Sequence, residues 1–326
     1  MMSEISFRPA VPTPDFPALA ALLSKVWPQM VTAGQMHEWE ERQPAGQIRL
    51  RFVAEKGQAG IIGYGLVYHE ASGAEGRFLL DVIIDPQWRN RGIGGKLYDH
   101  ILSVALDHGA NFLDCELSDN CPECLRFARK RGFIIDRHMF ESVLDLASFD
   151  YNHFQPIIFR LESEGIRFIS LASGGDTAAL RRQLYEIDRQ SALDDPASKG
   201  TFPTFEEFSR QVFEASWFRP EGQMMALDGQ KVIGLSAVGY FTHNNRMYNM
   251  TTGVLPAYRG RQIAQALKIL ALRYAQSYGA QTVIAHNDSQ NKAMLAINRK
   301  LGYRSQPGDY RMIKDLMLAA PIEIGA

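Results

Sequence analysis

The sequence predicts an α+β protein in which one unit, a mixed central sheet flanked by helices, is built twice. Its 326 residues are enough for two domains that each bury a core. Strand-like and helix-like patterns follow one order in both halves: a strand, two helices, antiparallel strands, and then a strand, a loop and a helix. We expect a first domain at residues 1–150, a connecting helix at 151–166 and a second domain at 167–326.

An internal repeat is the strongest of these observations. Residues 85–133 align without a gap on residues 255–303. The alignment pairs Pro86 with Pro256, Arg89 with Arg259, Arg91 with Arg261, Leu97 with Leu267, Gly109 with Gly279 and Gly132 with Gly302. Unrelated segments do not keep glycines, arginines and apolar positions in one register, so the two domains are homologous and in tandem.

The composition is that of a globular protein. Hydrophobic residues are 46%, charged residues 22% and the net charge is −1, which argues against a general nucleic-acid binder or a membrane-surface protein. No apolar run reaches the length of a membrane span, and residues 1–10 lack the pattern of a secretory signal. Three cysteines, an odd number, are typical of a reducing compartment, so we expect a cytoplasmic protein.

Local signals place the elements of the first half. Thr13-Pro14-Asp15 opens a helix, and Gly109 ends the one that begins at Ile93. Runs of β-forming residues bounded by glycine or turn residues indicate strands. The expected strands are 5–7, 48–55, 61–68, 78–84, 112–117 and 141–146, the last of which closes the domain, and the expected helices begin at residues 13, 30 and 93, with a short one that stops at Gly132.

The second half repeats the series. Residues 150–165 form the connecting helix, and Asp176 is the expected cap of the next helix. Asp228-Gly229 predicts the turn of a hairpin. The expected strands are 167–171, 223–227, 232–240, 247–255 and 282–286, the helices cover 205–213 and 289–301, and residues 194–203 form an irregular loop.

The loop after the strand at 78–84 predicts an anion site. Arg89, Asn90, Arg91 and Gly92 lie between this strand and a helix that opens with Ile93-Gly94-Gly95. Backbone N–H groups at a helix start bind anions, glycine allows close approach, and arginine adds charge-assisted contacts to phosphate. The Gly-Lys-Ser/Thr ending of a P-loop is missing, and the spacing differs from that of a dinucleotide fold. The stretch therefore predicts a pyrophosphate-binding loop.

This loop resembles the fingerprint of the GNAT (Gcn5-related) N-acetyltransferases, Gln/Arg-x-x-Gly-x-Gly/Ala. Arg89, Gly92 and Gly94 fill it, and Ile84-x-Pro86 matches the residues that precede it. The resemblance covers nearly the whole chain. It implies that the loop holds the pyrophosphate of acetyl-coenzyme A. It also implies that the pantetheine arm lies against the strand residues before each loop, which are Val82, Ile83 and Ile84 in the first domain and Thr252, Gly253 and Val254 in the second.

The two domains match this family differently. The second loop reads Arg259, Gly260, Arg261, Gln262, Ile263, Ala264, and a side chain at Gln262, where the family has glycine, would obstruct the pyrophosphate. We therefore predict cofactor binding in the first domain and keep the second as an alternative. The family's Asn-x-x-Ala block begins at Asn291 in the second domain, but Asn298 replaces the tyrosine that often protonates the departing thiolate. In the first domain Cys121, Cys124 and Ala128 take these positions.

The catalytic residues are not fixed by the sequence. Asp81 and His286 are weak candidates for the base, and Tyr303 or Tyr310 for the acid, while a structural role is the alternative for each. Asn249 and Thr251, or Asp194 and Asp195, could orient an acceptor.

The Cys121-Pro-Glu-Cys124 motif opens a helix, as redox sites do, but a second pair of cysteines for zinc is missing. We expect two reduced cysteines and no metal, with redox sensing as the lesser alternative.

The resemblance implies an N-acetyltransferase that moves the acetyl group of acetyl-CoA to an amine of a small molecule or peptide. The alternative is a coenzyme-A-binding sensor or scaffold with one or both domains degenerate. The tandem arrangement is similar to that of mycothiol synthase, although no residue assigns mycothiol as the substrate. We expect a monomer, as an internal pseudo-dimer, or a homodimer, with neither nucleic acid nor membrane as a partner.

Overall fold

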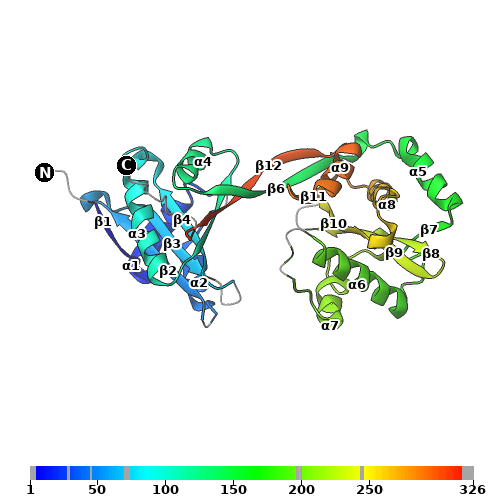
Figure 1. The fold of residues 1–326 in the computed structure, drawn as a ribbon, viewed down its shortest axis with the longest axis horizontal. Coiled ribbons are helices and arrows are strands. Elements are labelled where there is room, and N and C mark those ends of the chain that lie inside the picture. Colours follow the sequence, from blue (N-terminus) through cyan, green and yellow to red (C-terminus); the bar gives the residue numbers. More distant parts are fainter. Residues whose placement is uncertain are drawn as a thin grey trace, which may run out of the picture. The chain divides into compact units, whose positions relative to one another are not determined.

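The computed structural model describes residues 5–27, 30–44, 46–69, 74–195, 198, 200–242 and 246–317 (Figure 1). It divides into two compact units, one made of residues 1–136 and 310–326 and the other of residues 137–309. Pro196, which the sequence places in the irregular loop, lies outside the described residues. Among the described helices, none is both long and apolar enough to cross a membrane.

The first unit is a sheet with helices on both faces. Its strands follow the order β1-β2-β3-β4-β5, and the end of β12 continues it. The strands are β1 (Ser6–Pro9), β2 (Ile48–Glu55), β3 (Ile61–His69), β4 (Arg77–Ile84), β5 (Phe112–Ser118) and β12 (Arg304–Asp315), and the helices are α1 (Pro12–Leu23), α2 (Ala33–Glu41), α3 (Ile93–Asp107) and α4 (Pro122–Arg129).

Alternation along the strands supplies a core to each face of this sheet. Val53 packs with Phe16 and Leu19 of α1, whereas its neighbour Phe52 packs with Leu97 and Ile101 of α3. This alternation explains why one β-branched and aromatic run supports two layers of helices.

The second unit repeats this layout. Its strands follow the order β6-β11-β10-β9-β8-β7. The strands are β6 (Ile134–Asp145), β7 (Ile166–Ser170), β8 (Gln223–Asp228), β9 (Lys231–Phe241), β10 (Arg246–Val254) and β11 (Thr282–Asp288), and the helices are α5 (Tyr151–Ser163), α6 (Ala178–Leu193), α7 (Phe205–Phe208), α8 (Ile263–Ser277) and α9 (Lys292–Lys300). Leu161 of α5 and Leu267 of α8 share one core, and Leu184 of α6 belongs to another.

In both units two parallel strands separate after a short pairing. In the first unit β4 pairs with β5 only from Arg77 to Leu79. In the second unit β10 pairs with β11 only at Met247 and Tyr248. Each pair therefore opens toward the loop that follows its first strand.

A β-bulge distinguishes the second of these openings. Asn249 pairs with Val238 of β9 and Thr251 pairs with Ala237, so Met250 has no counterpart on β9. In the first unit β4 pairs with β3 without a shift from Leu79 to Ile84. A bulge leaves the ladder locally unpaired, so β10 has an unpaired residue at its opening, whereas β4 is paired with β3 throughout Leu79 to Ile84.

The last strands of the two repeats do not follow the predicted division of the chain. The predicted strand 141–146 begins earlier, at Ile134, and from Arg137 onward it belongs to the second unit, where residues 139–145 pair with β11. Strand β12, which was not predicted, ends in the first unit, where Met312 is fully buried. The compact units therefore differ from the ranges 1–150 and 167–326.

Two smaller predictions were wrong. Asp176 does not cap α6: it has φ 48° and pairs with Arg181 at 2.7 Å, while Thr177 accepts the N–H of Leu180. The expected helix at 205–213 is α-helical only as far as Phe208 and continues as a π-helix from Ser209 to Phe213.

Candidate active site

The two predicted loops have the same backbone conformation. Asn90 and Gly92 have φ 61° and 76°, and the equivalent Gly260 and Gln262 have φ 80° and 67°. Both loops thus use two left-handed residues separated by an arginine, a conformation that glycine and asparagine adopt most easily. Gln262 keeps the loop geometry although it carries a side chain.

The first loop presents N–H groups and an arginine. Helix α3 closes its first turn with a bond from Lys96 N–H to Gly92 C=O, so the N–H groups of Ile93, Gly94 and Gly95 have no partner within the helix. Arg91 stacks on the Trp88 ring at 4.8 Å, and no carboxylate among the described residues lies within ion-pair distance of it.

Arg89 is held closer to the protein. Its Nε donates to the Ile84 carbonyl at 3.2 Å, and its guanidinium lies 3.9 Å from Glu123. An added Cβ at Gly92 would meet nothing within 4 Å, so the approach to the first loop is open.

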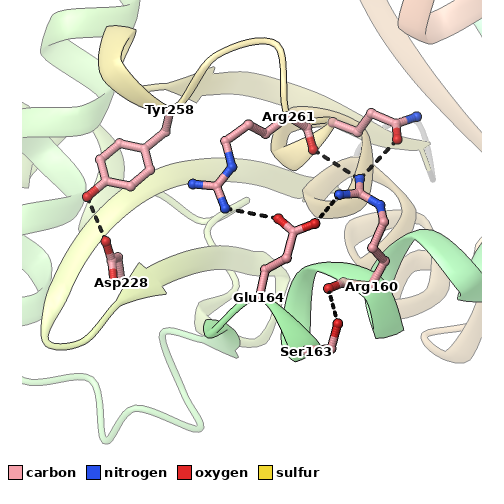
Figure 2. Close-up of polar contacts among 7 residues, drawn as sticks. Arg160, Ser163, Glu164, Asp228, Tyr258 and Arg261 are labelled. Carbon is pink, nitrogen blue, oxygen red and sulfur yellow. Dashed lines mark hydrogen bonds and ion pairs between the residues drawn. The ribbon is translucent and has the colours of Figure 1, made fainter.

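Both arginines of the second loop are already paired with carboxylates. Arg259 pairs with Asp194, and its Nε donates to Val254 C=O at 3.0 Å. Arg261 pairs with Glu164 at 3.0 Å, and Figure 2 shows that Glu164 also holds Arg160.

Arg160 fixes the loop residue that departs from the family pattern. It donates to the Arg261 carbonyl at 3.3 Å and to the side chain of Gln262 at 3.0 Å. The Gln262 side chain is therefore tied toward α5, and both arginines of this loop are engaged by carboxylates.

A cavity of about 1160 Å³ occupies the opening between β10 and β11. Its walls come from α6, β10, α8, β11 and α9, and include the loop residues Arg259, Gly260, Gln262, Ile263 and Ala264, the strand residues Thr252, Gly253 and Val254, and Asn291. Ligand sites usually have roughly 300–1,000 Å³, so this cavity has room for a large cofactor arm together with an acceptor.

Asp188 of α6 lines this cavity, although no motif in the sequence marks it as a site residue. Helix α6 lies so close to β10 that a Cβ on Gly253 would come within 1.7 Å of Ser191 Oγ. One turn earlier on the helix, Asp188 contacts the Thr251 side chain. Burial raises the pKa of Asp188 to about 6, and the hydrogen bond to Thr251 lowers it only in part.

Lys268 of α8 lines the same cavity and was also missed. Only 2% of it is exposed, and its Nζ donates to Asn249 Oδ1. Burial lowers the pKa of Lys268 to about 7. Asn249 is held in turn by bonds from its Nδ2 to Ala237 C=O at 2.9 Å and to Ser236 Oγ at 3.2 Å.

The structure separates the predicted catalytic candidates. His286 lines the cavity, but its side chain is 70% exposed and it stacks on Tyr248 at 5.7 Å. Tyr303 is buried, and burial raises its pKa far above the usual value. It is not among the residues that line the cavity.

Asp81 and Tyr310 belong to the first unit. Burial and the nearby Glu116 raise the pKa of Asp81 to about 6. Tyr310 packs against the core of that unit and is not among the residues that line the cavity of the second unit.

Asn298 and Asn291 have structural partners. Asn298, at the family's tyrosine position, is buried and donates to Asn287 Oδ1 at 2.8 Å. Asn291 caps α9 by accepting the N–H of Met294 at 3.2 Å, while its Nδ2 reaches Asp195 at 3.4 Å.

The expectation of two reduced cysteines in the Cys-Pro-Glu-Cys motif was wrong. Cys121 and Cys124 form a disulfide across the start of α4. Their sulfur atoms and a Glu123 oxygen lie within 4.8 Å of one another, but both sulfurs are bonded to each other.

Two units with separating parallel strands, each followed by an anion-binding loop and a helix, define a tandem acyl-CoA-dependent transferase. Sequence comparison agrees, because the pattern of the acetyltransferase (GNAT) family matches residues 16–133 and again residues 182–303. The chain belongs to this family.

Relatives and solved structures match most of the length of this chain. Mycothiol acetyltransferase of Amycolatopsis mediterranei is 26% identical over 258 residues, which cover 76% of this chain and 79% of that protein. A GCN5-related N-acetyltransferase from Sphaerobacter thermophilus has a TM-score of 0.59 at 17% identity, with 96% of each chain covered. A tandem GNAT protein from the clavulanic acid biosynthesis pathway has a TM-score of 0.55 at 18% identity and covers 98% of this chain and 99% of its own. At these identities the two structures show the fold.

The protein is therefore an acyltransferase that transfers an acetyl group from acetyl-CoA to an amine. Its residues fit that donor. The loops present N–H groups and arginines suited to a diphosphate, and the strand openings leave edges against which a pantetheine arm can bind.

Proposed function

We propose that acetyl transfer takes place in the second unit, on a primary amine of a small molecule. The bulge at Met250, which opens onto the cavity, is the observation that supports this choice most strongly. A thioester carbonyl needs a hydrogen-bond donor for the negative charge that develops on its oxygen. A backbone N–H freed by the bulge can supply it, and β4 of the first unit has no such shift.

Different segments of the second unit bind different parts of acetyl-CoA. The loop Arg259–Ala264 binds the diphosphate, and the strand edge Thr252–Val254 lies along the pantetheine arm. When bound, acetyl-CoA supplies the activated acetyl group. The chain holds the reacting groups in place, which alone accounts for much of the rate in such reactions.

Asp188 accepts the proton that the attacking amine loses. It reaches the cavity from α6, on the face of β10 opposite the helix that begins at the diphosphate loop. With its pKa raised to about 6 it is ionised at neutral pH yet basic enough to take a proton. Asp195 also lines the cavity, and its negative charge favours an amine as the acceptor, whereas Asp194 is already paired with Arg259.

A small-molecule acceptor is supported by the relatives, which are mycothiol acetyltransferases. For the first unit we propose coenzyme A binding at Arg89–Gly95 without transfer. Arg91 is not neutralised there, while the strand lacks the bulge.

The first test replaces Asp188 with Asn, which removes the base and keeps the shape. Transfer of labelled acetyl to a panel of primary amines that includes L-cysteinamide should lose roughly 10²- to 10⁴-fold in kcat. Acetyl-CoA affinity by calorimetry should stay the same. In the wild type, kcat/KM should fall as the pH drops through about 6, because Asp188 takes up a proton.

Glu186→Gln is the matched control, because Glu186 is an exposed carboxylate on the same helix that pairs with Arg189. It should leave transfer unchanged. Full activity of Asp188→Asn across the panel would exclude Asp188 as the base and remove the reason for placing transfer on this side of β10.

A further inference from the structure

Lys268 is a lysine buried without a counter-ion. From β10 it meets the amide of Asn249, and from the segment after α9 it meets the Tyr303 ring, with Nζ 5.2 Å from the ring centre. No carboxylate among the described residues lies within ion-pair distance of it. Burying an unpaired ammonium is strongly unfavourable, so stability does not explain this residue.

Its position is at the far end of the proposed path of the donor. The diphosphate loop begins α8, so the cofactor enters from the side of α8 and α9, where Lys268 also lies. From Val254 back to Asn249 the strand spans roughly 16 Å at about 3.3 Å per residue. An extended pantetheine arm bridges a similar length, which brings the thioester to the bulge beside Asn249 and hence beside Lys268.

A thioester that is attacked by an amine releases a thiolate, which needs a proton. Asn298 cannot provide it, because an amide does not titrate in this range and its Nδ2 is bonded to Asn287. Tyr303 is a poor candidate, because it does not line the cavity and burial raises its pKa far above the usual value. Lys268 is the buried cation on this side of the strand.

We propose that Lys268 is the catalytic acid of the second unit and protonates the departing coenzyme A thiolate. This inference rests on the proposed location of transfer. In the step, the amine nitrogen forms a bond to the acetyl carbon and gives its proton to Asp188. The carbon–sulfur bond then breaks, sulfur keeps the electron pair, and it takes a proton from the Lys268 ammonium. The neutral amine is recharged from water after the products leave.

The acidity of Lys268 suits this step. With a pKa of about 7 it is partly charged at neutral pH and gives up its proton more readily than an exposed lysine. Thiols ordinarily have a pKa of roughly 8.5, so the ammonium and the departing thiolate are close enough in acidity for the proton to pass between them.

The test uses coenzyme A itself as the probe and needs no acceptor. The ultraviolet absorbance of the bound thiolate is followed against pH in Lys268→Met and Lys268→Arg, each in a Gly92→Trp background that blocks the first loop. The ammonium should hold the bound thiol pKa below its free value by roughly 1 to 3 pH units. That shift should vanish in Lys268→Met and persist in Lys268→Arg, whose charge is permanent. The control is Lys231→Met, which removes the charge of an exposed lysine in the same unit.

Turnover adds a second readout on the full chain. Lys268→Met should lower kcat roughly 10²- to 10⁴-fold and remove the alkaline fall of the profile near pH 7. The deficit should shrink with acetyl-selenocoenzyme A, whose selenolate leaves without a proton.

The outcomes separate the two proposals. If the bound thiol pKa is the same with Lys and Met at position 268, Lys268 is not the acid. If Asp188→Asn still abolishes activity, the location of transfer stands and only the role of Lys268 is overturned. Coenzyme A that fails to bind in the Gly92→Trp background overturns the location of transfer and the acid together. Methionine keeps the length of the side chain, and Asn249 Oδ1 still accepts a hydrogen bond from Thr252 Oγ1, so the variant should fold.

Discussion

Single residues decide how alike the two loops are. Gly92 and Gln262 occupy the same left-handed position, at φ 76° and 67°. A non-glycine residue there costs about 1–2 kcal/mol, and the second loop tolerates it because Arg160 and the helix start hold the loop in place. The backbone is therefore conserved, and the difference between the loops lies in side chains.

We predict that Gly92→Gln, which gives the first loop the residue of the second, weakens acetyl-CoA binding there about tenfold. The reason is the lost close approach of phosphate to backbone N–H groups, worth about one hydrogen bond. Calorimetry on the intact chain should show two acetyl-CoA binding events, of which the tighter belongs to the first loop and should weaken in this variant. Gln262→Gly is the reciprocal variant and should tighten the second event. Unchanged affinities in both variants would mean that a side chain here does not meet the phosphates.

Some residues of the candidate site could be predicted from the sequence and others could not. The motif around Arg89 and Gly92 predicted a loop that the structure forms, because glycine spacing encodes backbone shape directly. Asp188 and Lys268 escaped, since a charged residue on a helix is ordinarily exposed and nothing local marks it as buried. The available signal was the position of Lys268 in the repeat, where the first domain has the buried Tyr98. It implied an inward-facing side chain.

At the scale of elements, helix α5 controls the second loop. It was predicted as a connector, but it packs against α8 and presents Arg160 and Glu164 to the loop (Figure 2). Glu164 engages Arg261, so an anion that binds the loop must compete with a carboxylate. Among the residues that the structure describes, no carboxylate competes in this way at Arg91 of the first loop.

Glu164→Gln should therefore raise coenzyme A affinity at the second loop, by about two- to fivefold, the order expected of an exposed ion pair. The gain should be larger at low ionic strength, because salt screens the competing charges. Glu162→Gln, an exposed carboxylate on the same helix, should change nothing. A salt-independent or absent gain would show that Arg261 does not contact the phosphates.

Element prediction succeeded where periodicity was clear and failed at the last strand. Strand β2 and helix α3 match their predicted bounds because their apolar spacing is regular. Strand β12 contains Pro307 and Gly308 and many charges, which do not indicate a strand. Its glycine is needed because an added Cβ at Gly308 would come within 2.1 Å of the Met139 carbonyl. Only this tertiary neighbour explains the residue.

At the scale of the whole chain, the last strand of each repeat contributes to the sheet of the other unit. Strands β6 and β12 occupy equivalent places in the repeats, yet β6 pairs with β11 in the second unit while the end of β12 enters the first. Arg311 of β12 bonds Asp114 at 3.3 Å, and Leu316 N–H bonds Asn111 C=O at 2.9 Å. The first unit therefore depends on residues from the far end of the sequence, which no local pattern could show.

This exchange makes a prediction about stability. Met312→Ala should destabilise the first unit, although residue 312 lies beyond all of the second unit in sequence, because Met312 is fully buried among Leu97 and Ile101. Truncating a buried Met or Leu costs about 2–5 kcal/mol. The reciprocal Leu144→Ala should destabilise the second unit, since Leu144 packs in that core despite its early position.

Hydrogen exchange measured peptide by peptide reports local opening. Faster exchange should appear at residues 93–107 for Met312→Ala and at residues 263–277 for Leu144→Ala. The opposite assignment would mean that each repeat keeps its own last strand and that the exchange is not present in solution.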